Sequence, residues 1–163
     1  MTRHHVSRRF PATDLPRWLV LVLVALAVPR TVLEDVGIVE PEGSLFYYFL
    51  ALVPFAVWLV VAVVRRSRRP FLDFLMVGVL YALSLVPVHQ VLWNVRPSLG
   101  HDPPAGAVAF ADHFSAGWQD LALRGYTTGI ALMIGIGSGL VAGIVALGAN
   151  AWKSKRRSGV NVA

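Results

Sequence analysis

A run of arginines between two long apolar segments constrains this chain more than any other feature. The four arginines are Arg65, Arg66, Arg68 and Arg69. The apolar segments run from Leu45 to Val64 and from Phe71 to Val95, and each is long enough to cross a hydrocarbon core of about 30 Å as an α-helix. Because guanidinium groups are costly to place in lipid, the arginine run predicts the tight turn of a membrane hairpin.

The composition supports a membrane protein and excludes several other classes. Hydrophobic residues make up 56% of the 163 residues, which is more than a soluble globular domain usually carries. The net charge of +6 would suggest a nucleic-acid partner only if the cations shared one face, and here they lie in separate clusters, so no nucleic acid is expected. The chain has no cysteine, which rules out disulfides and thiolate metal sites.

Basic and acidic clusters alternate along the chain. Besides the arginine turn, basic residues gather near the two ends, and most acids lie in the connections between. The C-terminal basic cluster is Lys153, Lys155, Arg156 and Arg157. Because Lys and Arg in short loops resist translocation, this alternation predicts four spans with both termini in the cytoplasm. The expected location is the plasma membrane, with the basic clusters against anionic lipid headgroups.

The predicted fold is therefore all-α: a four-transmembrane-helix bundle forming one membrane domain over residues 1–163. Spans are expected over 17–36, 45–64, 71–95 and 126–152, with cytoplasmic tails at 1–16 and 153–163. The first span has the weakest pattern, because Pro29 and Arg30 interrupt it. Arg30 is expected to reach the interface or to pair with Glu34 one turn later.

The long connection between the third and fourth spans contains a second helical pattern. From Ala107 to Leu123, apolar residues recur at spacings of three and four, and polar residues take the opposite face. This predicts an amphipathic helix on the outer membrane surface or capping the bundle, although Gly117 weakens the pattern.

The last span carries small residues at every fourth position. They are Thr127, Ala131, Gly135, Gly139 and Gly143. In lipid, small residues let helix backbones approach closely. The row predicts helix packing, and packing against the hairpin of the same chain is favoured over a homo-oligomer or another membrane protein as partner.

Polar residues are expected to gather at the outer ends of the spans. This outer polar cluster comprises Arg30, Glu34, Asp35, His89, Asn94, Arg96, Asp112 and His113. An ionisable residue within a span, such as His89, suggests a function, but a neutral imidazole bonded to a neighbour such as Gln90 is the favoured reading. The histidines and acids show no spacing typical of zinc ligands, so no metal site is expected.

Three functional hypotheses follow, of which the first two involve no cofactor. The chain shows no catalytic signature, so an enzyme is not expected. The favoured one is a non-enzymatic accessory or scaffold subunit that acts through helix contacts. The second is a transport or permeation unit for a small solute, using a polar mouth of Arg30, Glu34, His89 and Arg96. The third is a haem-binding redox subunit through His89, which lacks a second histidine in another span.

Overall fold

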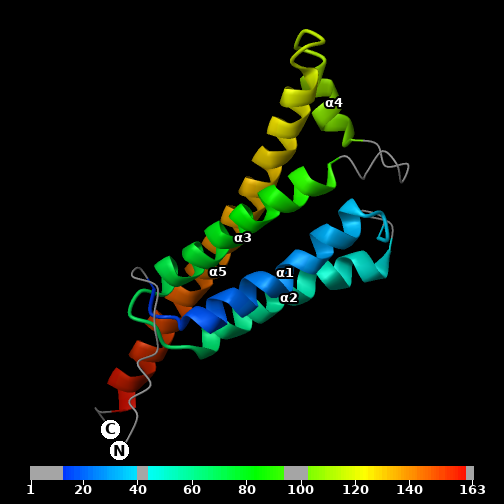
Figure 1. Cartoon of the computed structure of the whole chain (residues 1–163). Coiled ribbons are helices and arrows are strands. Elements are labelled where there is room, and N and C mark those ends of the chain that lie inside the picture. Colours follow the sequence, from blue (N-terminus) through cyan, green and yellow to red (C-terminus); the bar gives the residue numbers. More distant parts are fainter. Residues whose placement is uncertain (1–12, 40–43, 94–102, 161–163) are drawn as a thin grey trace, which may run out of the picture.

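The computed structural model describes residues 13–39, 44–93 and 103–160, and every regular element in these ranges is a helix. The helices are α1 (Arg17–Asp35), α2 (Leu45–Val64), α3 (Pro70–Leu92), α4 (Ala105–Ala111) and α5 (Gln119–Val160). Helices α1 and α2 lie side by side, and α3 packs along α5 (Figure 1). Three of them, α2, α3 and α5, are long and apolar enough to cross a membrane, as expected of a helical membrane protein.

Helix α1 differs from these three, because charged residues enter its last turns. It is not among the helices apolar enough to span by composition. Pro29 lies inside the helix without ending it. The helix ends at Asp35, and Gly37 follows with a φ of 74° that suits glycine. The amides of Gly37 and Ile38 donate to carbonyls of the last helical turn.

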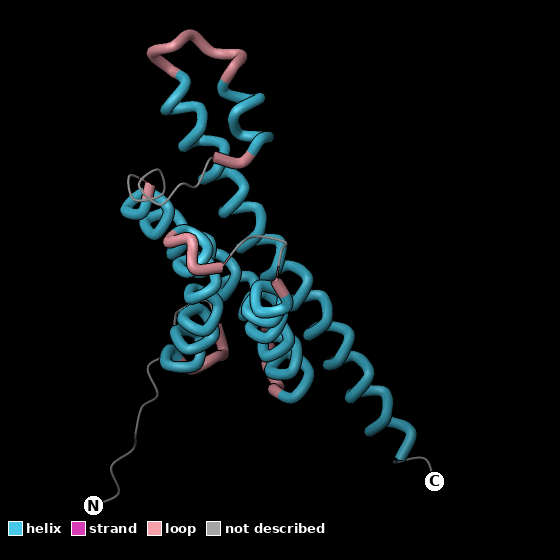
Figure 2. The backbone as a smooth tube through the Cα atoms, turned by 90° about the vertical axis from the view of Figure 1, so that its right-hand side faces the viewer, coloured by secondary structure: helices cyan, strands magenta, loops and turns pink. Residues whose placement is uncertain are grey.

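Residues 107–123 do not form the single amphipathic helix that their spacing predicts. Helix α4 ends at Ala111, the chain turns through residues 112–118, and α5 begins at Gln119 (Figure 2). Phe110 packs on Tyr126 across this helical hairpin, with ring centroids 5.5 Å apart. A local spacing of three and four is compatible with both arrangements, and Gly117, a poor helix former, falls in the turn.

Helices α3 and α5 approach so closely that glycine is required at their contact. A Cβ atom on Gly139 would lie 2.7 Å from the carbonyl oxygen of Phe74 and 2.8 Å from the Cα of Gly78. A Cβ on Gly135 would lie 2.6 Å from the Cβ of Ala82. The small-residue row therefore faces α3 of the same chain over these positions.

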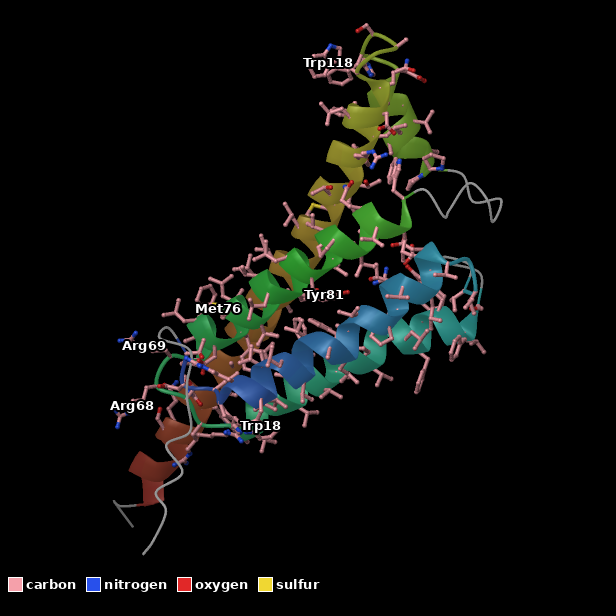
Figure 3. The ribbon with its side chains drawn as sticks, in the orientation of Figure 1. Trp18, Arg68, Arg69, Met76, Tyr81 and Trp118 are labelled. Carbon is pink, nitrogen blue, oxygen red and sulfur yellow. The ribbon has the colours of Figure 1, made fainter. Side chains whose placement is uncertain are left out.

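The half of the bundle next to the arginine turn is tightly packed around Trp58. Its Nε1 donates to the carbonyl oxygen of Leu23 at 2.9 Å, and its ring meets that of Tyr81 edge to face at 5.7 Å. Trp58 of α2 therefore contacts both α1 and α3, the latter through Tyr81, which is labelled in Figure 3. Other buried residues of this core are Leu15, Val20, Phe74, Val77, Ala142 and Ala146.

The last residues of the N-terminal tail, 13–16, pack against the arginine turn and the start of α3. The amide of Asp14 donates to Oδ1 of the buried Asp73 at 2.7 Å, and the amide of Arg68 donates to Oδ2 of Asp14 at 2.8 Å. Asp14 therefore fastens the tail to the α2–α3 turn. The start of α1 and the C-terminal end of α5 lie at this end of the molecule (Figure 1), together with the labelled Arg68 and Arg69 (Figure 3).

Candidate functional site

A cavity of about 290 Å³ lies between α1, α3 and α5, in the half of the molecule away from the arginine turn. Its polar wall consists of Arg30, Thr31, Glu34, Tyr81, His89, Tyr126 and Thr127. Its apolar wall includes Leu85, Ile130, Ala131 and Ile134, and residues Pro104 and Gly106 border it next to α4. A smaller cavity of about 50 Å³ adjoins it and shares Arg30, Tyr81 and Ile134.

Arg30 occupies the wall of both cavities and connects α1 to α2. Its Nη2 donates to Tyr47 Oη at 3.1 Å and to Glu34 Oε2 at 3.4 Å, and its guanidinium lies 5.0 Å from the centre of the Tyr47 ring. Its Nε is buried and has no acceptor among the residues that the structure describes. A buried N–H without a partner costs about 1–3 kcal/mol, so an acceptor from a ligand or water at this atom would be favourable.

His89 and Asp35 form the contact between α3 and the end of α1. Nδ1 of His89 lies 2.7 Å from Oδ2 of Asp35, and the Asp35 side chain is only 1% exposed. A carboxylate buried this deeply needs a donor or a cation beside it, and the imidazole supplies one. The pair therefore fixes the cavity wall at the point where α1 ends.

A polar chain on α3 and α5 supports the same end of the cavity. Arg124 donates to Oε1 of Gln90 at 3.3 Å and to Asp120 at 2.8 Å, and it stacks over Trp93 at 5.1 Å. Gln90 in turn donates to Thr128 at 3.3 Å. Gln90 therefore bonds to α5 and not to the imidazole of His89.

The structure brings together half of the predicted outer polar cluster. Arg30, Glu34, Asp35 and His89 meet at the cavity. Asp112 and His113 do not: they are exposed on the α4–α5 turn, where Nδ1 of His113 lies 2.8 Å from the carbonyl oxygen of Ala109. Asn94 and Arg96 lie outside the described residues.

The remaining predicted residues divide between two locations. In the small-residue row, Thr127 and Ala131 line the cavity, while Gly135, Gly139 and Gly143 contact α3. The basic residues Arg65, Arg66, Arg68, Arg69, Lys153 and Lys155 lie at the opposite end, and the side chains of Arg156 and Arg157 are outside the description.

Several cavity residues are not evident from the sequence. Thr31, Tyr81 and Tyr126 contribute hydroxyl groups, and Tyr81 lies beside Thr31 of α1. Single hydroxyl residues in apolar helices are common, so these three are recognised only once the structure shows that their helices pack around one cavity.

Metal and haem sites gain no support from the geometry. Over residues 13–39, 44–93 and 103–160, no group of three or more His, Cys, Asp or Glu side chains could hold a metal ion. His89 is the one histidine on the cavity wall of this part of the chain, and its Nδ1 already contacts Asp35.

The chain matches no protein-family model, no curated protein and no solved structure. A functional proposal therefore rests on its residues and their geometry.

Proposed function

We propose that this chain is a four-span protein of the plasma membrane that binds a small solute in the cavity between α1, α3 and α5, as a transport or permeation unit. Arg30 carries the proposal, because it lines two adjoining cavities and its buried Nε lacks a protein acceptor in the described ranges. The larger cavity, about 290 Å³, lies at the lower end of the range of about 300–1,000 Å³ typical of small-ligand sites.

The proposed fourth span is α1. At 1.5 Å per residue, its 19 residues extend about 28 Å, close to the thickness of the hydrocarbon core. Apart from Arg17 at its start, its charged residues lie in the last turns. There Arg30 contacts Glu34 and Tyr47, and Asp35 contacts His89. Pairing of this kind lowers the cost of placing charges near the membrane.

The proposed sidedness follows from the cations, which resist translocation. The arginine turn, the start of α1 and the C-terminal end of α5 share one end of the molecule, which we assign to the cytoplasm (Figure 1). The α4–α5 turn then lies outside.

Because the chain has no native cysteine, single introduced cysteines report sidedness cleanly. A membrane-impermeant maleimide should label Ser115→Cys on intact cells, since Ser115 is exposed on the α4–α5 turn. Ser154→Cys, exposed near the C-terminal end of α5, should react only after the membrane is permeabilised. The reverse labelling pattern would overturn the proposed orientation.

The charges of the cavity indicate which solutes it would accept. On this wall the cation Arg30 is paired with the carboxylate of Glu34 at 3.4 Å, so the pair offers little net charge to attract an ion. Hydroxyl groups of Thr31, Tyr81 and Tyr126 provide both donors and acceptors. We therefore propose an uncharged or zwitterionic solute that places an acceptor at Arg30 and an apolar part against the Ile130 to Ile134 face of α5.

The packed core favours a site that is reached from the outer side. Trp58 borders the smaller cavity, and the Leu23, Trp58 and Val77 side chains beyond it are almost fully buried. A solute crossing the membrane would have to separate these side chains. The described arrangement thus suits a closed, binding-competent state of a transporter rather than an open pore.

A thermal-shift panel on the purified full-length protein tests solute binding. The probes are neutral and zwitterionic amino acids, polyols and small amides. At least one should raise the melting temperature, and Arg30→Gln should weaken its binding about tenfold or more, as expected for loss of a charged hydrogen bond. The matched variant Arg17→Gln removes an exposed cation at the start of α1 that does not line the cavity, and it should bind normally.

Two results would contradict this proposal. One is a panel in which no probe stabilises the wild-type protein. The other is a binding probe whose affinity is the same in the wild type and in Arg30→Gln, because a solute that ignores Arg30 does not use the donor that carries the proposal.

An accessory or scaffold function is the second candidate, and one observation bears on where it would act. Gly135 and Gly139 pack on α3, so they are not available to another protein. On α5, Gly125, Gly129 and Gly137 have open space where a Cβ would lie. A partner helix would therefore dock on this second face of α5.

A further inference from the structure

We propose a second binding site at the arginine-turn end of the molecule, which takes the phosphate group of an anionic lipid. A cavity of about 260 Å³ lies between the α2–α3 turn and α5. Its lining consists of Arg66, Ser67, Asn150, Lys153 and Ser154. This site is separate from the solute cavity and does not depend on the solute proposal.

The lining contains donors and no carboxylate. Arg66 and Lys153 are cations, and Asn150 adds an amide. A planar guanidinium beside an ammonium is the combination that proteins use for phosphate oxygens, because the guanidinium can donate two parallel bonds and the ammonium adds a concentrated charge. The lining therefore selects an anion with several acceptor oxygens.

Contacts among distant parts of the chain hold this site in place. Nδ2 of Asn150 donates to the carbonyl oxygen of Ser67 at 2.9 Å, which fixes the turn against α5. Nζ of Lys153 donates to the carbonyl oxygens of Val63 and Val64, at the end of α2. The ammonium is therefore positioned between α2 and α5 before any ligand arrives.

Donors remain after these internal bonds are counted. The hydroxyl of Ser154 donates to Ala151, and that of Ser67 to Asp14, so neither hydroxyl proton is free. The guanidinium of Arg66 is exposed and has no partner among the described residues. Lys153 and Asn150 each retain a further N–H. These are the groups that would hold the phosphate oxygens.

Like Asp73, which contacts Ser67, Asp14 is an acidic side chain at this turn. Its Oδ2 accepts from the amide of Arg68 at 2.8 Å and from the hydroxyl of Ser67 at 3.3 Å. Asp14 does not line the cavity. Its carboxylate thus stabilises the turn without occupying the anion site.

A lipid is favoured over a free anion as the source of the phosphate. The site lies where α2 ends, α3 begins and α5 leaves the bundle, which is the level of the lipid headgroups for helices that cross a bilayer.

Native mass spectrometry and thermal shift on the purified full-length protein in micelles test the site. The probes are phosphatidylglycerol, zwitterionic phosphatidylcholine and inorganic phosphate. Phosphatidylglycerol should remain bound and raise the melting temperature, and phosphatidylcholine should do neither. Arg66→Gln should weaken phosphatidylglycerol binding about tenfold, as expected for loss of a charged hydrogen bond. Lys153→Gln should act in the same direction.

Arg69→Gln is the matched control, because Arg69 lies in the same turn, is exposed and does not line the cavity. It makes the same change in net charge and should leave binding nearly unchanged. Equal losses in Arg66→Gln and Arg69→Gln would overturn the proposal, because the cations would then act only through net charge. Stabilisation by inorganic phosphate as strong as that by phosphatidylglycerol would overturn the assignment to a lipid.

Discussion

Replacing Gly139 by alanine is expected to force α3 and α5 apart and to destabilise the protein. The new Cβ would lie 2.7 Å from the carbonyl oxygen of Phe74 and 2.8 Å from the Cα of Gly78. Both neighbours are backbone atoms, so no side-chain rotation can relieve the contact. Overpacking of this kind costs about 1–3 kcal/mol, and a rigid helix pair places it at the upper end.

Gly137→Ala, two residues away on the same helix, is the matched control. Nothing lies within 4 Å of a Cβ at this position. Because alanine is favoured over glycine in a helix by about 1 kcal/mol, this variant should be as stable as the wild type or slightly more so. Melting temperature in detergent and resistance to unfolding by a denaturing detergent measure the difference. Equal melting temperatures of the two variants would show that α3 and α5 do not pack as described.

This contact also explains why the small-residue row bears on the solute cavity. In the same row, Ala131 lies one turn before Gly135 and Thr127 lies two turns before it, and both residues line the cavity. The glycines set the distance between α3 and α5, and the cavity lies where the row changes to larger residues. Gly139→Ala should therefore weaken solute binding together with stability, whereas Arg30→Gln should weaken binding alone.

Local patterns in the sequence predict the helices well, because an apolar run bounded by charge leaves few alternatives. The segment Leu45 to Val64 is α2 in the structure with the same bounds, and the arginines that follow form the turn before Pro70. The pairing of Arg30 with Glu34 is also local, four residues apart on one helix face, and it is present at 3.4 Å.

Contacts between distant residues are not visible in such patterns. Asp14 and Asp73 are 59 residues apart, and no feature of either indicates that one amide will meet the other carboxylate. The same holds for His89 and Asp35, whose proximity depends on how α1 lies against α3. The α4–α5 hairpin is a related case, since the periodicity of residues 107–123 does not reveal where the chain reverses.

The largest loss of stability outside the glycine contact is expected from Trp58→Ala. Trp58 is 1% exposed, and it contacts α1 through Leu23 and α3 through Tyr81. Truncating a buried tryptophan to alanine costs about 3–5 kcal/mol, because the cavity left behind does not close fully. Trp58→Phe keeps an aromatic ring but loses the hydrogen bond to Leu23, which should cost about 1 kcal/mol for that bond.

Trp18→Ala serves as the control, because Trp18, at the start of α1 and labelled in Figure 3, is 61% exposed. Its melting temperature should stay close to that of the wild type, and a drop as large as that of Trp58→Ala would contradict the assigned core.

The position of Trp58 adds a functional consequence. Tyr81 lines both cavities and rests on the Trp58 ring, so removing that ring frees Tyr81 to move into the space. Trp58→Ala should thus lose solute binding as well as stability, while Trp58→Phe, which still supports Tyr81, should retain binding.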